Sequence, residues 1–142
     1  MFYAQRIAVE EAQITASTAG AFGRGSRVLY KTGILGTIAG GRIYYNNNGT
    51  AAQAGNGSQA AASQMLFVGT DDASGDELLL EGFIRLASNT NFSSGASGRP
   101  VYLGSSGDAT ITVPTGVRRV IGYVWDASDS IIYFSPDNTW IV

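Results

Sequence analysis

The sequence contains no cysteine and no histidine. Without cysteine the chain has no disulfide bond and no thiolate nucleophile, and without histidine it lacks the side chain that most often acts as a general base near neutral pH. The absence of both residues also removes the usual ligands of zinc and other transition metals. Because these absences exclude most enzyme mechanisms, we expect a protein with no catalytic site, no metal site and no cofactor.

Charged residues and long apolar runs are also scarce. Charged side chains make up 14% of the chain, and no stretch approaches the roughly 20 apolar residues that a membrane-spanning helix requires. The first residues, MFYAQRIAVEEAQ, include two glutamates and no apolar run of signal-peptide length. We therefore expect no membrane partner, and a protein that is made in the cytoplasm without a signal peptide.

The few charges are distributed unevenly along the chain. Residues 1–45 carry five basic and two acidic side chains, whereas the remainder carries four basic and nine acidic ones. The first third thus has a net charge of +3 and the rest −5, a dipole that can orient the protein on a charged surface. Because this basic third is far less dense than a nucleic-acid-binding patch, we expect no nucleic-acid partner.

Glycine, by contrast, is abundant, and it separates short runs of β-forming residues. The chain has 19 glycines, and runs of valine, isoleucine, leucine, tyrosine and phenylalanine alternate with turns rich in glycine, serine and asparagine. This pattern is typical of an all-β fold, an antiparallel barrel or sandwich of short strands. Residues 47–64 are of low complexity, and we interpret them as a loop with one helical turn at its end. Strands are expected at residues 5–9, 12–16, 27–31, 42–46, 65–69, 78–86, 100–103, 110–113, 117–125 and 131–134.

Two stretches of the chain resemble each other. GRIYY at 41–45 is similar to GRPVY at 98–102, and LFVG at 66–69 is similar to VIGY at 120–123. A unit so short could hardly bury its apolar face alone, which favours two copies folded together over two separate domains. We therefore expect an N-terminal arm or strands over residues 1–26 and one β domain over 27–142, with duplicated halves at 27–90 and 98–142. The alternative is chance similarity between glycine-rich hairpins, and strand orders that differ between the halves would favour it.

Carboxylates are the remaining candidates for chemistry. The acidic loop that starts at Thr70 partly matches a calcium-binding loop, but its first position is not an aspartate and its flanks resemble strands. Asp108, Asp126 and Asp129 could supply the acid and base of a glycoside hydrolase. All three lie in turn-like stretches beside glycine or serine, where aspartate commonly binds its own backbone. We therefore expect them to hold turns.

Aromatic and apolar residues gather in the last third and at the two ends of the chain. Tyr123 and Trp125 are two apart on one expected strand, so they share a face, for which the core is favoured over an interface. Apolar chain ends fray in water unless something covers them, which points to a partner or a second subunit. The candidate contact residues are these apolar ends and the basic residues near the start: Phe2, Tyr3, Arg6, Arg24, Arg27, Trp140 and Ile141.

The pattern of strands and turns resembles a known group of proteins. Its segments are GRIYYNNNG at 41–49, MLFVGT at 65–70, DELLLEGFIRLASN at 76–89, GRPVYLGSSGDATITVPTG at 98–116, RRVIGYVWD at 118–126 and IIYFSPDNTW at 131–140. Together they are similar to small all-β virion structural proteins of tailed bacteriophages, of the capsid decoration or head-fibre type. The resemblance covers residues 27–142 and is strongest from residue 98 onward, whereas the first 26 residues take no part in it.

This resemblance implies a function without chemistry. The expected protein is a non-enzymatic capsid decoration (cement) protein on the virion surface that binds the major capsid protein and stabilises the head. It would act as a homo-oligomer, with a trimer favoured over a dimer, and the candidate contact residues would meet the capsid or a neighbouring subunit. The alternative within the virion is a tail- or fibre-associated protein with a host-surface or carbohydrate-binding role. A carboxylate-dependent glycan hydrolase is the alternative of a different class.

Overall fold

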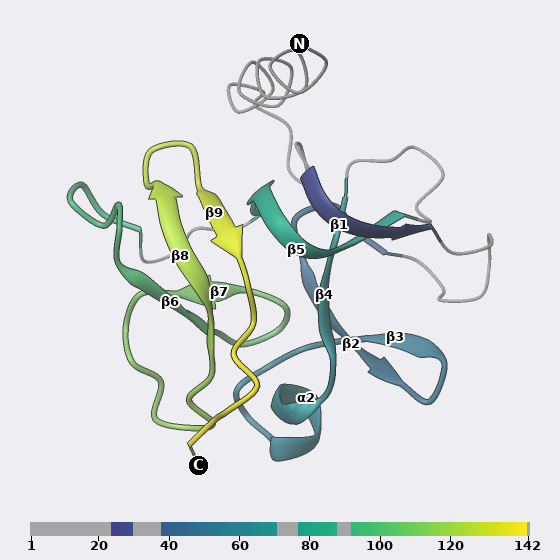
Figure 1. The fold of residues 1–142 in the computed structure, drawn as a ribbon. Coiled ribbons are helices and arrows are strands. Elements are labelled where there is room, and N and C mark those ends of the chain that lie inside the picture. Colours follow the sequence, from purple (N-terminus) through teal and green to yellow (C-terminus); the bar gives the residue numbers. More distant parts are fainter. Residues whose placement is uncertain (1–23, 30–37, 71–76, 88–91, 142) are drawn as a thin grey trace, which may run out of the picture.

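The structure is a computed structural model that describes residues 24–29, 38–70, 77–87 and 92–141, and of residues 24–29 only the backbone. The described residues form an antiparallel sheet and one short helix, which confirms the predicted all-β fold (Figure 1). The elements are β1 (Arg24–Leu29), β2 (Ile43–Asn47), β3 (Thr50–Gln53), α2 (Gln59–Ser63), β4 (Leu66–Gly69), β5 (Glu77–Arg85), β6 (Pro100–Leu103), β7 (Ala109–Thr110), β8 (Val120–Asp126) and β9 (Ile131–Phe134).

The long strand β5 is the corner of this sheet. Its first part, at Leu78 and Leu79, pairs with β4, and its second part, from Gly82 to Arg85, pairs with β9. β1 pairs along the opposite edge of the same strand. Gly82 lies between the two parts with a φ of 142°, a conformation that other residues rarely adopt. The sheet therefore curls at β5, and the curl is visible in Figure 1.

The two halves of the chain have the same strand order. The sheet runs β3-β2-β4-β5-β9-β8-β6-β7, so each half consists of a hairpin, a third strand on the other side of that hairpin, and a fourth strand beside the third. The registers agree at one aligned pair, since Tyr45 pairs with Leu66 as Tyr102 pairs with Val120, and differ by one residue at the others, because the pairing of β6 with β8 is irregular between Val101 and Tyr102. Aligned residues also face different sides of the sheet: Phe67 belongs to the outer cluster and its counterpart Ile121 to the shared core. The strand orders of the halves are equivalent, and the duplication stays a prediction.

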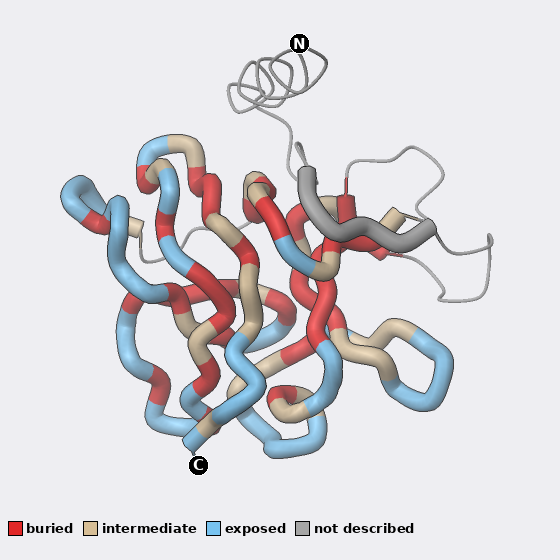
Figure 2. Tube along the Cα trace, in the orientation of Figure 1, coloured by how far each residue is buried: buried red, intermediate tan, exposed pale blue. Residues whose placement is uncertain are grey.

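One hydrophobic core serves both halves. Its members are buried side chains from the inner faces of both four-stranded halves. Figure 2 shows these buried stretches along the strands. The larger ones are Ile43, Val68, Leu79 and Ile84 in the first half and Val101, Leu103, Ile121, Ile132 and Phe134 in the second. Neither half could bury these residues alone, so the halves fold together.

The halves are joined again at the turn between β6 and β7. The backbone N–H of Ile43 donates to the carbonyl of Gly107 (2.9 Å), and the N–H of Gly107 donates to the carbonyl of Ala54 (2.7 Å). Arg42 forms an ion pair with Asp108 at the same place. The β6–β7 turn of the second half therefore bonds to the β2–β3 hairpin of the first half, as a neighbouring strand would, and connects the two ends of the curled sheet on this side.

The outer faces of the halves differ. In the first half, the side of β2, β4 and β5 that faces away from the shared core carries a second buried cluster of Ile38, Tyr44, Phe67 and Leu78. The rings of Tyr44 and Phe67 stack at 6.1 Å, and the N–H of Ala39 donates to the hydroxyl of Tyr44 (2.9 Å). The corresponding side of the second half is exposed, as described below.

Most predicted strands are present, and the differences have local causes. The low-complexity segment contains β3 as well as the predicted helical turn, because Asn48 and Gly49 take positive φ angles (52° and 88°) and fold β3 back onto β2. The strand predicted at 110–113 ends at Thr110, whose hydroxyl accepts a hydrogen bond from the N–H of Thr112 (3.0 Å). β8 starts at Val120, three residues later than predicted.

The first residues of the chain bear on the predicted arm. The strands predicted at 5–9 and 12–16 lie outside the described residues. β1 spans 24–29 and therefore crosses the position between residues 26 and 27 at which the arm was separated from the β domain. Since β1 pairs with β5, at least this part of the expected arm belongs to the sheet.

Candidate functional site

Four aromatic side chains stand together on the outer side of β5, β9 and β8. Strand alternation places Ile84, Ile132 and Val124 in the core, so their neighbours point outward. The register puts the neighbours side by side, since Phe83 pairs with Tyr133 and Tyr133 with Tyr123. Trp125 follows on β8. We call these four residues the aromatic face: Phe83, Tyr123, Trp125 and Tyr133.

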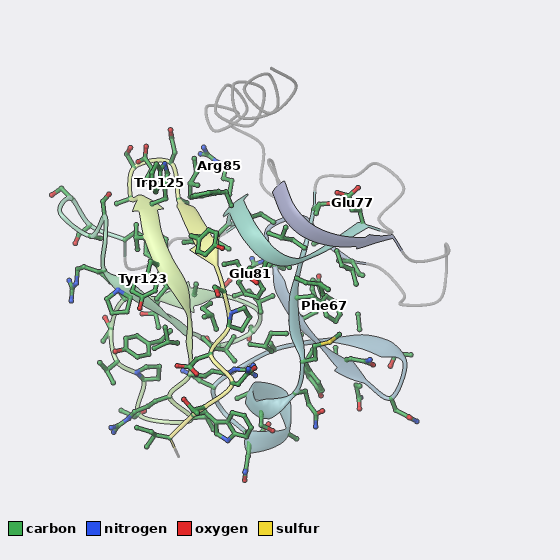
Figure 3. The ribbon with its side chains drawn as sticks, viewed as in Figure 1. Phe67, Glu77, Glu81, Arg85, Tyr123 and Trp125 are labelled. Carbon is green, nitrogen blue, oxygen red and sulfur yellow. The ribbon has the colours of Figure 1, made fainter. Side chains whose placement is uncertain are left out.

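The rings of the aromatic face contact one another edge to face. The ring centroid of Phe83 lies 5.2 Å from that of Trp125 at an interplanar angle of 75°, and 5.1 Å from that of Tyr133 at 61°. Tyr123 and Trp125 nevertheless remain 53% and 55% exposed, and Figure 3 shows both on the outside of β8. They share a face as predicted, but the prediction that they lie in the core is wrong: Val124 takes the inner side of β8, and the irregular pairing of β8 with β6 at Ile121 lets Ile121 enter the core as well.

Charged and hydroxyl groups border the aromatic face. The hydroxyls of Tyr133 and Ser135 both donate to Oε1 of Glu81, at 3.1 and 3.3 Å. Partial burial and the bond to Glu81 raise the pKa of Tyr133, so its hydroxyl keeps its proton at neutral pH. At the other end of the face, Arg85 lies 3.5 Å from a carboxylate oxygen of Asp129.

Asp126 fixes the turn that follows Trp125. Its Oδ1 accepts hydrogen bonds from the N–H and hydroxyl of Ser128 (2.9 and 2.6 Å) and from the N–H of Asp129 (3.2 Å). These bonds, led by the one from the Ser128 hydroxyl, lower the pKa of Asp126. The turn interpretation is thus confirmed for Asp126, and the turn holds the end of β8 in place.

A groove adjoins the aromatic face. Its volume is about 580 Å³, and it lies between the end of α2, the start of β4 and the segment after β9. Glu81 lines the groove and accepts a hydrogen bond from Tyr133 of the aromatic face, so the groove is continuous with that face. The other side chains that matter most in it are Met65, Arg119, Asn138 and Trp140.

Arg119 ties the two halves together at this groove. The side chain is buried, and its guanidinium donates to the carbonyls of Ala62 (2.7 Å), Gln64 (2.6 Å) and Asp137 (2.8 Å). Its terminal carbon lies 5.6 Å from the ring centroid of Trp140. Desolvation lowers the pKa of Arg119 and Asp137 counteracts this, but a guanidinium stays charged at any ordinary pH. The neighbouring Arg118 is exposed, as its position on the opposite face of the chain predicts.

The contact residues predicted from the sequence are not brought together as one surface. Trp140 is half-buried and packs against the core, whereas Ile141 is 65% exposed. The backbone of Ile141 pairs with that of Arg118 through two hydrogen bonds (2.6 and 3.0 Å). The other predicted contacts lie outside what the structure describes, either entirely (Phe2, Tyr3 and Arg6) or in their side chains (Arg24 and Arg27).

The carboxylates considered for chemistry have structural partners. Asp108 pairs with Arg42, Asp129 lies near Arg85, and Asp126 holds its turn. Most of the loop compared with a calcium site, residues 71–76, lies outside the described residues. Within 24–29, 38–70, 77–87 and 92–141, no group of three or more acidic side chains is arranged to hold a metal ion.

Sequence reasoning missed the contribution of β5 to this site. Glu81, Phe83 and Arg85 alternate along the strand, and this spacing puts all three on one side of a sheet. The alternation was the available signal, but it did not reveal that β9 and β8 would place Tyr133 and Tyr123 beside Phe83. That neighbourhood depends on strand pairing between distant parts of the chain.

Comparison of the chain with protein-family models, with curated proteins and with solved structures found no match. Among the described residues, no helix is long and apolar enough to cross a membrane.

Proposed function

We propose that this protein is a non-enzymatic structural protein of a tailed bacteriophage virion, a capsid decoration (cement) protein that binds the outer surface of the head. The observation that carries this proposal is that charged side chains of the protein bind other groups of the same chain and so stabilise its fold. Arg119 and Asp126 bind main-chain groups, and Arg42 binds Asp108 across the two halves. A fold held in this way is a rigid body that presents surface, and the resemblance of its sequence pattern supports the phage assignment.

In this proposal the partner is the major capsid protein, and the C-terminal end of the chain contributes to the contact. Ile141 is an apolar side chain that is 65% exposed, yet its backbone is fixed by two hydrogen bonds to Arg118. A residue whose backbone is already fixed loses little further backbone freedom when it binds. The basic first third of the chain completes the contact. Many copies on one particle act together, so each single contact can be weak.

The oligomeric state is part of the same proposal. We expect a homo-oligomer, a trimer in preference to a dimer, since oligomerisation covers apolar chain ends that would otherwise fray. Binding to the head stabilises it by mass action, because the protein binds the assembled shell better than its separated subunits.

A second candidate function is favoured by one observation. The aromatic face is exposed beside carboxylates, as expected of a tail- or fibre-associated protein that binds the host surface or its carbohydrates. The two candidates share the fold and differ in where the protein is found on the particle.

Addition of the purified protein to heads that were assembled without it tests the first candidate. We expect saturable binding with a fixed number of copies per head, and a higher temperature at which the heads release their DNA. Ile141→Asp should weaken this binding by about tenfold or more, because it places a charge at the apolar contact.

The matched control is Asn47→Asp, which adds the same charge at an exposed residue of the β2–β3 hairpin; Figure 1 shows this hairpin on the opposite side of the view from the C-terminus. This variant should bind heads as the unmodified protein does. Heads that take up no protein, or uptake that never saturates, would refute the assignment to the capsid.

A further inference from the structure

The aromatic face and the groove beside it form one continuous surface. Glu81 stands at their junction, where it is bound by Tyr133 from the aromatic face and by Ser135 from the groove. Figure 3 shows Glu81 near the middle of the molecule and Tyr123 and Trp125 to one side of it. The groove volume of about 580 Å³ lies within the range of sites for small ligands. We propose that this surface is a binding site for a neutral oligosaccharide.

The aromatic rings supply the apolar part of such a site. The C–H groups on one side of a sugar ring carry partial positive charge and pack against the negative face of an aromatic ring. Trp125 and Tyr123 leave about half of their surface open, and contacts with Phe83 hold Trp125 in one orientation. Trp140 provides a further aromatic ring inside the groove, where Arg119 fixes it. Aromatic rings are thus present along the whole surface.

The polar groups are of the kind that bind hydroxyls. Both hydrogen bonds to Glu81 go to Oε1, so its Oε2 can accept from a ligand hydroxyl. The amide of Asn138 and the hydroxyl of Ser135 line the groove and can each donate and accept. A polyol needs this mixture of acceptors and donors at the edge of an apolar surface.

The charges at the border select between classes of partner. Among the side chains that the structure describes, three carboxylates border the aromatic face, those of Glu81, Asp126 and Asp129, and one basic group, Arg85, lies next to Asp129. This excess of negative charge disfavours acidic saccharides. A protein partner is also disfavoured, because the centres of protein interfaces are depleted of charged residues. A neutral saccharide satisfies the carboxylates through its hydroxyls.

The exposure of this surface is itself informative. On the first half, the equivalent outer side of the sheet carries a buried cluster around Phe67, whereas on the second half the aromatic rings remain open. Two halves built alike therefore differ at the proposed site. The inference rests on the carbohydrate-binding role of the second candidate function and deepens it, because it names the surface that binds and the class of saccharide.

The test is binding of the purified full-length protein to an array of neutral, amino and acidic oligosaccharides, followed by titration of the best neutral one by isothermal titration calorimetry. We expect neutral glycans to bind and acidic ones not to bind. Trp125→Ala should weaken the affinity by about tenfold or more, and Glu81→Gln should weaken it by a smaller factor.

Val113→Ala is the matched control, since it shortens an equally exposed apolar side chain that belongs neither to the groove lining nor to the aromatic face. It should bind the same glycan with unchanged affinity, and circular dichroism should show that all three variants remain folded. The proposal is overturned if no neutral glycan binds, if acidic glycans bind better, or if Val113→Ala weakens binding as much as Trp125→Ala. If no glycan binds and Trp125→Ala loses attachment to heads, the surface is a protein interface and the capsid proposal stands without it.

Discussion

Arg119→Leu is expected to lower the free energy of unfolding by about 3 kcal/mol or more. The substitution removes the guanidinium that donates to the carbonyls of Ala62, Gln64 and Asp137. These acceptors lose their charged donor, and a leucine in its place offers them no hydrogen bond. The loss also separates α2, in the first half, from the segment after β9 in the second. Urea denaturation followed by circular dichroism measures the change.

Arg118 offers a control in the adjacent position. Its side chain is exposed and donates one hydrogen bond, from Nε to the carbonyl of Pro114 (3.1 Å). Arg118→Leu should therefore change the stability by less than about 1 kcal/mol. If the two variants lose stability equally, the proposal that Arg119 stabilises the contact between the two halves is wrong.

Gly122→Ala is expected to cost about 2 to 4 kcal/mol of stability. Gly122 lies in the middle of β8 with a φ of 153°, which residues with a side chain rarely adopt. A Cβ at this position would overlap the carbonyl oxygen of Tyr133 and approach the Cα of Phe134 to 3.2 Å. Both obstacles are backbone atoms of β9, so β8 and β9 would have to separate. This separation would also disturb the aromatic face, which spans the two strands.

Gly57→Ala provides the comparison for this variant. A Cβ at Gly57 has no other atom within 4 Å, and its φ is not positive. Alanine restricts the unfolded chain more than glycine does, so this variant should be unchanged or slightly more stable. The midpoints of urea denaturation of both variants and the unmodified protein decide the question. A Gly122→Ala protein as stable as Gly57→Ala would show that β8 and β9 are not packed as closely as described.

The strand pattern could be predicted because its signals are local. Alternation and glycine-rich turns identify β6 and β9 to the residue, and the strand predicted at 78–86 differs from β5 by one residue at each end. β3 was missed because Thr-Ala-Ala-Gln has little β propensity of its own. Its backbone is held by pairing with β2, and this pairing is a property of the hairpin as a whole.

The candidate site was harder to predict because it depends on which side of a strand faces the core. Tyr123 and Trp125 had to share a side, but alternation alone treats the two sides of β8 as equivalent. The side is decided by Val124, which enters the core that both halves share, and by the irregular pairing of β8 with β6 at Ile121, where the alternation changes sides. In the same way, the sequence indicates that Arg118 and Arg119 diverge, but not that Arg119 reaches the carbonyl of Ala62 in the other half.

The central claim is that this chain is a structural component of the virion, located on the head. The most direct test is quantitative mass spectrometry of separated heads and tails from purified particles of the virus that encodes it. The account predicts many copies per head and none in the tail fraction. A few copies in the tail fraction alone would move the protein to the second candidate function, and absence from both fractions would contradict a structural role in the particle.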